Sequence, residues 1–247
     1  HLAQRLAEAR ARGGAVGRNS WVASSYSHRC ASSASVVAAG RAHSIILWGP
    51  PGTGKTTIAR LLSSAFKLQF EQLSAVFSGV ADLKKTFEAA RQRRKMGQGT
   101  LLFIDEIHRF NRSQQDSFLP VVEDGTVVLV GATTENPSFE LNGALLSRAQ
   151  VLVLRRLDDA ALEKLLERAE AHYGEPLKLT PDARASLRAM ADGDGRYLLN
   201  LAEEVANLKI VAPLDPAGLM AAVQRRMPLY DKSREEHYNI ISALHKS

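Results

Sequence analysis

Residues 49–56 read GPPGTGKT, directly after the short apolar run Ile45–Trp48 and directly before an amphipathic segment. This stretch fits the pattern G-x-x-x-x-G-K-[ST] in the order of strand, loop and helix that the pattern requires. Its glycines let backbone N–H groups turn inward, and the following helix adds its positive N-terminal dipole, so the loop can surround phosphate oxygens. A glycine-rich turn that matches by chance is the alternative, and the complete context argues against it.

The side chains of this loop have distinct expected roles. Lys55 should reach the β- and γ-phosphates of ATP, and the hydroxyl of Thr56 should be a ligand of Mg²⁺. The residues expected to line the nucleotide site are Gly49, Pro50, Pro51, Gly52, Thr53, Gly54, Lys55, Thr56 and Thr57. The loop therefore predicts ATP as the nucleotide and Mg²⁺ as its cofactor.

Short apolar runs alternate with amphipathic stretches from Ser44 onward, as in a parallel sheet with crossover helices. Five strands are predicted, at Ile45–Trp48, Leu68–Leu73, Leu101–Ile104, Val127–Val130 and Val151–Leu154. Fully apolar runs such as LLFI and VVLV suit strands that are buried on both faces. The pattern predicts an α/β fold.

The ends of the chain differ in character from this region. Beyond Leu154, three segments with helical periodicity follow without a strand between them, at Ala160–His172, Pro181–Ala191 and Arg196–Val211. Near the start, a helical stretch at Leu2–Arg12 precedes a Gly-, Ser- and Ala-rich run that offers little for a core. We therefore divide the chain into an atypical N-terminal segment (1–40), a nucleotide-binding core (41–154), a helical lid domain (155–228) and the start of a truncated C-terminal domain (229–247).

Two adjacent carboxylates, Asp105 and Glu106, follow the apolar strand Leu101–Ile104. Ligands of open α/β sheets bind at the carboxyl ends of the strands, which is where this pair should lie. Asp105 should hold the Mg²⁺ shell, and Glu106 should polarise the attacking water as general base. The alternative is an acidic helix N-cap, and the phosphate loop upstream favours the catalytic role.

Further polar side chains are candidates for the same site. Thr134, with Asn136 as the alternative, follows the strand Val127–Val130 and would place a hydroxyl or amide beside the γ-phosphate; an ordinary polar turn is the other interpretation. Arg148 precedes the last strand, where an arginine can stabilise phosphoryl charge in a neighbouring subunit. Arg196 opens a helix of the lid domain. A lone arginine is usually a surface charge, so both arginine roles depend on the resemblance described below.

Length and composition limit the size of the domains and the classes of protein that are possible. The 247 residues, 45% of them hydrophobic, suffice for one large domain and a small one. No apolar run approaches the roughly 18 residues of a membrane span, so we expect a soluble intracellular protein. Cys30 is the only cysteine, which excludes an intramolecular disulfide and argues against structural zinc. The net charge of +6 and pI near 9.6 permit contact with nucleic acid without selecting it.

Other charged residues leave alternatives open. The basic run RQRRK at 91–95 fits either DNA phosphates or a solvated helix end, and the second is favoured. Arg109 and Arg112, after the acidic pair, suit DNA if their helix faces a channel, and suit a salt-bridged surface equally. His108 is interpreted as a packing or hydrogen-bonding histidine, since phosphoryl transfer needs no further base.

Taken together, several segments closely resemble the RarA/MgsA family of AAA+ ATPases, the bacterial relatives of the Werner-helicase-interacting ATPase. They are ILWGPPGTGKTT, LLFIDEIHRFNRSQQDSFLPVVEDG, GATTENPSFELNGALLSRAQV, GDGR and YDKSREEHYNIISALHKS, within Ala39–Ser247. The resemblance implies a P-loop NTPase core of AAA+ type with a five-stranded parallel sheet and a helical lid. It also implies site roles: Walker A at Gly49–Thr56, Walker B at Asp105 and Glu106, sensor 1 at Thr134, the arginine finger at Arg148 and sensor 2 at Arg196.

The same resemblance implies a function. Members of this family are similar in being homotetrameric, DNA-stimulated ATP hydrolases that act in replication, recombination and repair. Their implied partners are single-stranded, gapped or forked DNA and single-stranded-DNA-binding protein, in the cytoplasm and at the nucleoid if the protein is bacterial. Residues 12–38 depart from the family pattern, and the sequence ends where the oligomerisation domain of the family should begin.

Other functions share part of this pattern. A clamp-loader-like ATPase or a nucleotide-gated scaffold would contain the same motifs. A small-molecule P-loop kinase would share Lys55 and Thr56 but would need a pocket for its acceptor, and Glu106 and the segment ATTEN at 132–136 argue against it.

Overall fold

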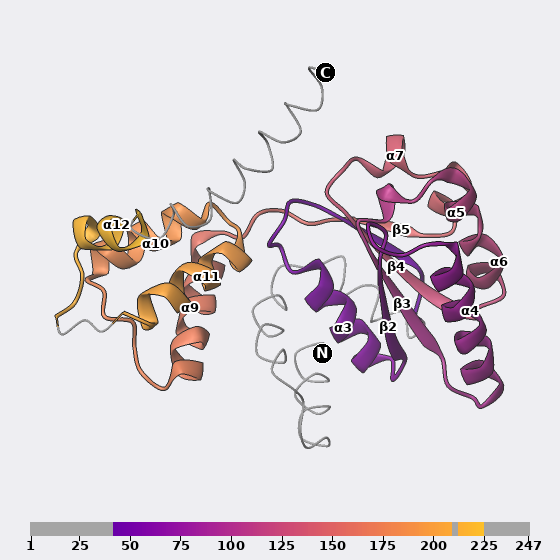
Figure 1. Cartoon of the computed structure of the whole chain (residues 1–247), viewed down its shortest axis with the longest axis horizontal. Coiled ribbons are helices and arrows are strands. Elements are labelled where there is room, and N and C mark those ends of the chain that lie inside the picture. Colours follow the sequence, from indigo (N-terminus) through magenta and orange to yellow (C-terminus); the bar gives the residue numbers. More distant parts are fainter. Residues whose placement is uncertain (1–41, 209–211, 225–247) are drawn as a thin grey trace, which may run out of the picture. The chain divides into compact units, whose positions relative to one another are not determined.

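The structure, a computed structural model, describes residues 42–208 and 212–224 (Figure 1). The chain divides into two compact units, with the boundary between Leu157 and Asp158. The whole N-terminal segment (1–40), with the helix expected at Leu2–Arg12, and residues 229–247 lie outside the described residues. Among the helices that are described, none is both long and apolar enough to cross a bilayer.

The first unit contains a five-stranded sheet in the order β2-β3-β4-β1-β5, and every neighbouring pair is parallel. The strands are β1 (Ile45–Trp48), β2 (Gln69–Ser74), β3 (Thr100–Asp105), β4 (Val127–Thr133) and β5 (Gln150–Val153). The predicted α/β fold with five parallel strands is thus confirmed. Because all pairs are parallel, the carboxyl ends of the five strands lie at one edge of the sheet.

Strand β4 is longer than its apolar run predicts. It continues from Val130 through Gly131 to Thr133, and these added residues are buried. A Cβ on Gly131 would lie 2.8 Å from Ile46 Cδ1 and 2.9 Å from Ile107 Cδ1. The glycine is therefore part of the core, where it leaves room for Ile107 to pack, and is not the start of a turn.

Helices cover both faces of the sheet, which explains why its central strands are apolar throughout. On one face, Ile45, Leu47 and Phe103 pack with Ile58 and Leu62 of α3. On the other, a second cluster joins the strands to α4 and α6, and Figure 1 shows α3 on the side of the sheet opposite α4 and α6. The helices are α3 (Lys55–Ala65), α4 (Val80–Lys95), the 3-10 helix η2 (Ile107–Arg109), α5 (Arg112–Asp116), α6 (Phe118–Glu123), α7 (Pro137–Glu140) and α8 (Gly143–Leu146).

The second unit is helical. It contains α9 (Asp159–Tyr173), α10 (Pro181–Ala191), α11 (Gly195–Ala206) and α12 (Pro216–Gln224). Helix α11 ends before the predicted Val211, at the C-cap Asn207, and residues 209–211 are outside the described part. Helix α12 was not predicted, because its short Ala-rich run carries little periodic signal. A parallel bridge, Leu179 to Leu214, joins the segments that precede α10 and α12.

A network of partly buried ion pairs connects α9 to α10. The guanidinium of Arg184 donates to both carboxylate oxygens of Glu170, at 2.6 and 2.9 Å, and its Nε donates to Glu163 at 2.7 Å. The N–H of Leu177 also donates to Glu170, at 2.8 Å. Burial opposes the ionisation of Glu170, but the hydrogen bonds from Arg184 and Leu177 outweigh it and hold the pKa of this carboxyl below its ordinary value.

This network predicts an acid-sensitive helical unit. Because the pKa of Glu170 is lower in the folded than in the unfolded chain, its stabilising effect is complete above the ordinary value of 4.5 and is lost as pH falls through the folded-state pKa. We expect the Glu170→Gln variant to lose less stability than the wild type between neutral pH and about pH 3. Thermal denaturation followed by circular dichroism measures the stability of both proteins at each pH. Equal losses in the two proteins would contradict a stabilising role of ionised Glu170.

Candidate functional site

The loop after β1 has the backbone conformation that a phosphate site requires. Gly52 has φ of 69° and Gly54 has φ of 86°, both in the left-handed region that glycine tolerates. Gly54 is the N-cap of α3 and brings no side chain to cap it. The first helical turn therefore has no side-chain cap, which leaves its N–H groups available to an anion.

Lys55 and Thr53 both make hydrogen bonds within this loop. Lys55 Nζ donates to the carbonyl oxygens of Gly49 at 2.7 Å and Pro50 at 2.9 Å, so its ammonium lies over the loop. The buried Thr53 donates from its hydroxyl to Pro50 O at 2.9 Å. Thr56 and Thr57 are half-buried in the first turn of α3. The predicted nucleotide-lining residues are thus contiguous at the carboxyl end of β1.

Gly49 fixes the loop to the sheet on two sides. Its N–H donates to Thr133 O of β4 at 3.1 Å. A Cβ at this position would lie 2.4 Å from Leu154 O, just after β5, so a side chain could not be accommodated without moving the loop. The start of the loop is therefore set by the ends of the two strands that flank β1.

The acidic pair lies at the end of β3, on the same edge of the sheet. Asp105 is the last residue of β3 and is half-buried. Glu106 has φ of 52° and ψ of 46°, a left-handed conformation that is costly for a residue with a side chain. The fully buried Ile107 that follows anchors the turn in the core. The backbone is thus held in a strained form where it presents a carboxylate.

The alternative role of Glu106 as a helix cap is not what the geometry shows. Glu106 precedes η2, but its side chain makes no capping hydrogen bond. Its Oε2 instead lies 3.5 Å from the hydroxyl of Thr134 and 3.3 Å from Nδ1 of His108. The carboxylate therefore faces the end of the neighbouring strand β4.

The two candidates after β4 have different contacts. Thr134 is the donor that approaches Glu106. Asn136 is the N-cap of α7, and its side-chain oxygen accepts from Ser138 N at 3.0 Å. Because the amide of Asn136 is used in capping, the geometry favours Thr134 as the polar group beside the acidic pair.

The two arginine candidates are not brought to this site by any contact within the described chain. Arg148 Nε donates to Glu123 at 2.5 Å, and its Nη1 donates to Ala144 O at 2.8 Å. Arg196 is exposed in the first turn of α11, in the second unit. Any role of Arg148 or Arg196 in phosphoryl transfer therefore requires contacts beyond a single unit, such as those in an assembly of subunits.

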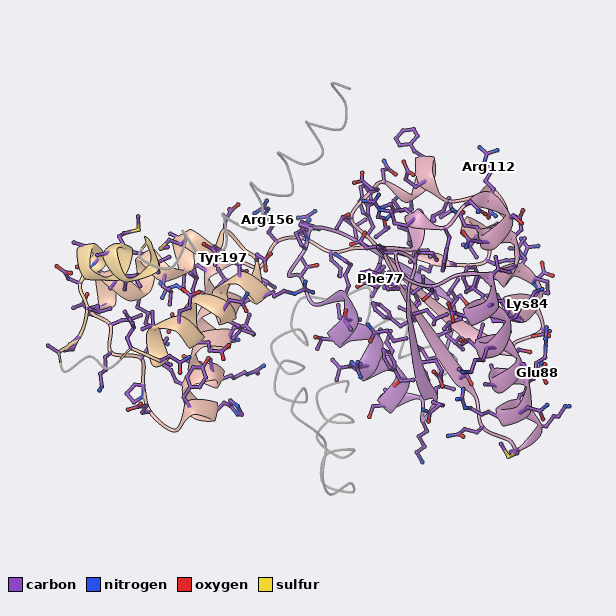
Figure 2. All side chains as sticks on the ribbon, in the orientation of Figure 1. Phe77, Lys84, Glu88, Arg112, Arg156 and Tyr197 are labelled. Carbon is purple, nitrogen blue, oxygen red and sulfur yellow. The ribbon has the colours of Figure 1, made fainter. Side chains whose placement is uncertain are left out.

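The basic segments divide into paired and exposed residues. Arg93 pairs with Glu71, Arg94 lies 3.5 Å from Asp124, and Arg91 lies 3.7 Å from Glu88. The run at 91–95 is therefore largely a surface of ion pairs. Arg109 and Arg112 are exposed, and Figure 2 shows the Arg112 side chain extending from α5 away from the rest of the unit.

His108 makes polar contacts, as expected of a hydrogen-bonding histidine, but sequence reasoning did not identify its partners. Its Nδ1 lies 3.0 Å from the hydroxyl of Thr133, besides its contact with Glu106. The signal that could have found them is strand register, because β3 pairs with β4 with Ile104 opposite Gly131. That register places the turn after β3 beside the last residues of β4.

The donor set fits a nucleotide with Mg²⁺. The amides of the first turn of α3 suit phosphate oxygens, and the Thr56 hydroxyl and Asp105 carboxylate are oxygen ligands of the kind Mg²⁺ prefers. Within residues 42–208 and 212–224, no group of three or more His, Cys, Asp or Glu side chains could hold a metal by itself. Such a sparse protein contribution is usual for Mg²⁺ bound together with nucleotide phosphates.

A parallel sheet in the order 2-3-4-1-5, with a phosphate loop after β1 and an acidic pair after β3, defines a P-loop ATPase of the AAA+ class. The family described as "ATPase family associated with various cellular activities (AAA)" matches residues 45–157. A second family, described as "AAA C-terminal domain", matches residues 172–247.

Similar proteins identify the family within this class. The chain is 44% identical over 221 residues to replication-associated recombination protein A of Escherichia coli (strain K12), covering 85% of this chain and 49% of that protein. It is 40% identical over 235 residues to ATPase WRNIP1 of Dictyostelium discoideum, covering 83% of this chain and 26% of that protein. The chain belongs to the family of replication-associated recombination protein A and WRNIP1. It spans about half the length of the bacterial relatives that it matches.

A solved structure shares the fold. The Thermotoga maritima RuvB Holliday junction branch migration motor superposes with a TM-score of 0.63 at 24% identity, covering 77% of this chain and 64% of that chain. At this identity the likeness speaks for the fold alone.

Proposed function

We propose that this chain hydrolyses ATP. We also propose that a protein with the length of its bacterial relatives couples this hydrolysis to remodelling of DNA or replication intermediates. The observation that carries the proposal is how β4 connects the two halves of the site. Its residue Thr133 accepts from Gly49 N at the start of the phosphate loop, and its successor Thr134 approaches Glu106. The loop and the acidic pair thus meet across one buried strand.

The phosphate loop binds the triphosphate in this proposal. The N–H groups from Gly52 to Lys55 surround the phosphates, and the Lys55 ammonium leaves the carbonyls of Gly49 and Pro50 for the β- and γ-phosphate oxygens. Thr56 and Asp105 would hold Mg²⁺, which neutralises charge that develops on the phosphates.

The acidic pair and Thr134 orient the attacking water. The carboxylate of Glu106 accepts a proton from the water, as a general base within hydrogen-bond reach. The hydroxyl of Thr134 lies 3.5 Å from Glu106 and is the neighbouring donor that would contact the γ-phosphate. These roles require a carboxylate and a hydroxyl at adjacent strand ends, which is where the two residues lie.

Arg148 and Arg196 complete the site only in an assembly. We assign Arg148 as the finger that reaches the site of a neighbouring subunit, and Arg196 as the sensor of the helical lid. Both are at least partly exposed, as such roles require. The resemblance to tetrameric family members supports a homo-oligomer, with a tetramer for the full-length protein.

Arg148→Ala is expected to lower ATP turnover by at least about ten-fold in the assembled full-length protein, because a finger in trans stabilises transition-state charge. Lys84→Ala, which removes an exposed cation on α4 of the same unit, is the control for loss of one positive charge. Mixing Arg148→Ala with Glu106→Gln subunits should restore part of the turnover, since some interfaces would then contain both residues. Steady-state assays of the mixtures measure this, and the absence of any rescue would count against a finger in trans.

DNA is the proposed partner, in single-stranded, gapped or forked form, together with single-stranded-DNA-binding protein. The names of the relatives, which refer to replication and recombination, support this choice. The exposed Arg109 and Arg112, in the segment after the acidic pair, are candidate phosphate contacts.

Steady-state ATPase with and without single-stranded or forked DNA tests the function of the full-length protein. A DNA-dependent motor should be stimulated by one of these structures, and the stimulation should fall with rising salt. Slow turnover that no DNA alters would favour a nucleotide-gated scaffold instead.

A further inference from the structure

His108 and Thr133 form a buried polar pair beside Glu106. The side chain of His108 is 8% exposed, and Thr133 is fully buried at the end of β4. His108 Nδ1 lies 3.0 Å from Thr133 Oγ1 and 3.3 Å from Glu106 Oε2. One ring nitrogen thus lies within reach of the catalytic carboxylate and of a hydroxyl on the neighbouring strand.

The chemistry of the three groups limits which tautomer of His108 can act on Glu106. A carboxylate only accepts hydrogen bonds, so the tautomer with a hydrogen on Nδ1 is the one that can donate to Glu106. Thr133 Oγ1 accepts from Glu135 N at 3.0 Å, and its own hydrogen can go to Glu135 O at 3.3 Å. The oxygen of Thr133 is therefore oriented by its own backbone and remains a second acceptor for the Nδ1 hydrogen.

We propose that His108 is a positioning residue for hydrolysis, which holds the Glu106 carboxylate against the end of β4 and releases it toward the attacking water. Thr133 makes the release possible, because it accepts the Nδ1 hydrogen when the carboxylate turns away. A buried N–H without an acceptor would be costly, so a lone histidine would hold Glu106 in one place. The proposal rests on the proposed function, since it needs Glu106 to act as the base.

The turn itself does not depend on the polar atoms of His108. Ile107 is fully buried, and the missing side chain of Gly131 gives it room, since a Cβ there would lie 2.9 Å from Ile107 Cδ1. Apolar packing therefore anchors the left-handed Glu106. Substitutions of His108 are expected to change the position of the carboxylate more than the fold.

Matched variants separate the position of the donor from its mere presence. His108→Asn keeps a donor two bonds from Cβ, where Nδ1 stands, whereas His108→Gln moves it one bond farther. We expect His108→Gln to lower kcat about ten-fold with KM within about two-fold, and His108→Asn to stay within about three-fold of wild type. Thr133→Val should lower kcat in the same way, and Thr133→Ser, which keeps the hydroxyl, should not.

The deciding experiment places His108→Gln in a Glu106→Gln background and measures kcat, KM and binding of a fluorescent ATP analogue in the full-length protein. If His108 acts through Glu106, the double variant should be no slower than Glu106→Gln alone. Additive losses, an unchanged kcat in His108→Gln and Thr133→Val, or a change confined to KM would overturn the proposal. Thermal denaturation identifies a variant that fails to fold, and the remaining variants then decide.

The same experiment distinguishes a failure of the proposed function from a failure of the role of His108. A wild type that turns over ATP no faster than Glu106→Gln would overturn the proposed function and, with it, this role of His108. An active wild type with a normal His108→Gln variant would overturn the role of His108 alone.

Discussion

Replacing Lys55 by alanine is expected to abolish nucleotide binding and turnover. Its ammonium donates to the carbonyl oxygens of Gly49 and Pro50, in a loop that leads into a helix without a side-chain cap. Without it the β- and γ-phosphates lose the cation that offsets their charge, and we expect kcat/KM to fall more than about 100-fold. Fluorescence anisotropy of a labelled ATP analogue and a phosphate-release assay measure the two effects.

Lys84→Ala is the control for this variant. Lys84 is an exposed lysine on α4 of the same unit (Figure 2), so its loss changes net charge without touching the loop. Binding and turnover should match the wild type in the control. Tight nucleotide binding by Lys55→Ala would show that the loop is not the phosphate site.

Replacing Glu106 by glutamine should stop hydrolysis and leave ATP bound. The amide keeps the size of the side chain but cannot take a proton from water, and loss of a general base is expected to lower kcat by about 10²- to 10⁴-fold. The affinity for ATP should stay within about two-fold, since the contacts of the loop are unchanged. Kd from titration and kcat from single-turnover kinetics report these quantities separately.

Glu88→Gln, an exposed carboxylate on α4 (Figure 2), controls for the loss of one negative charge. It should leave kcat unchanged. Unaltered turnover in Glu106→Gln would mean that another group is the base, and a large loss of affinity would mean that Glu106 binds the nucleotide instead.

The phosphate loop and the strands were predictable because their signals are local. The turn at Gly52 and Gly54 depends on the glycines themselves and on the helix that follows, and the strands β1, β3 and β4 contain apolar runs. The end of β4 was misplaced because Gly131 resembles a turn residue in the sequence, whereas in the fold it makes room for Ile107. Local composition does not reveal which neighbour a glycine accommodates.

The finer structure of the site depends on contacts between segments far apart in the chain. The contact between Thr133 and His108 joins positions 25 residues apart, and it follows from the register of β3 and β4. The acidic partners of Arg93 and Arg94 come likewise from β2 and from the segment after α6. The roles of Arg148 and Arg196 remain predictions, because they depend on assembly beyond the contacts of one unit.

The most direct test of this account is a crystal structure of the Glu106→Gln variant with ATP and Mg²⁺. We expect the triphosphate on the amides of residues 52–55, Lys55 Nζ moved from the loop carbonyls to the β- and γ-phosphate oxygens, and the metal on Thr56 and beside Asp105. A nucleotide bound elsewhere, or a terminal phosphate turned away from positions 105 and 106, would contradict it.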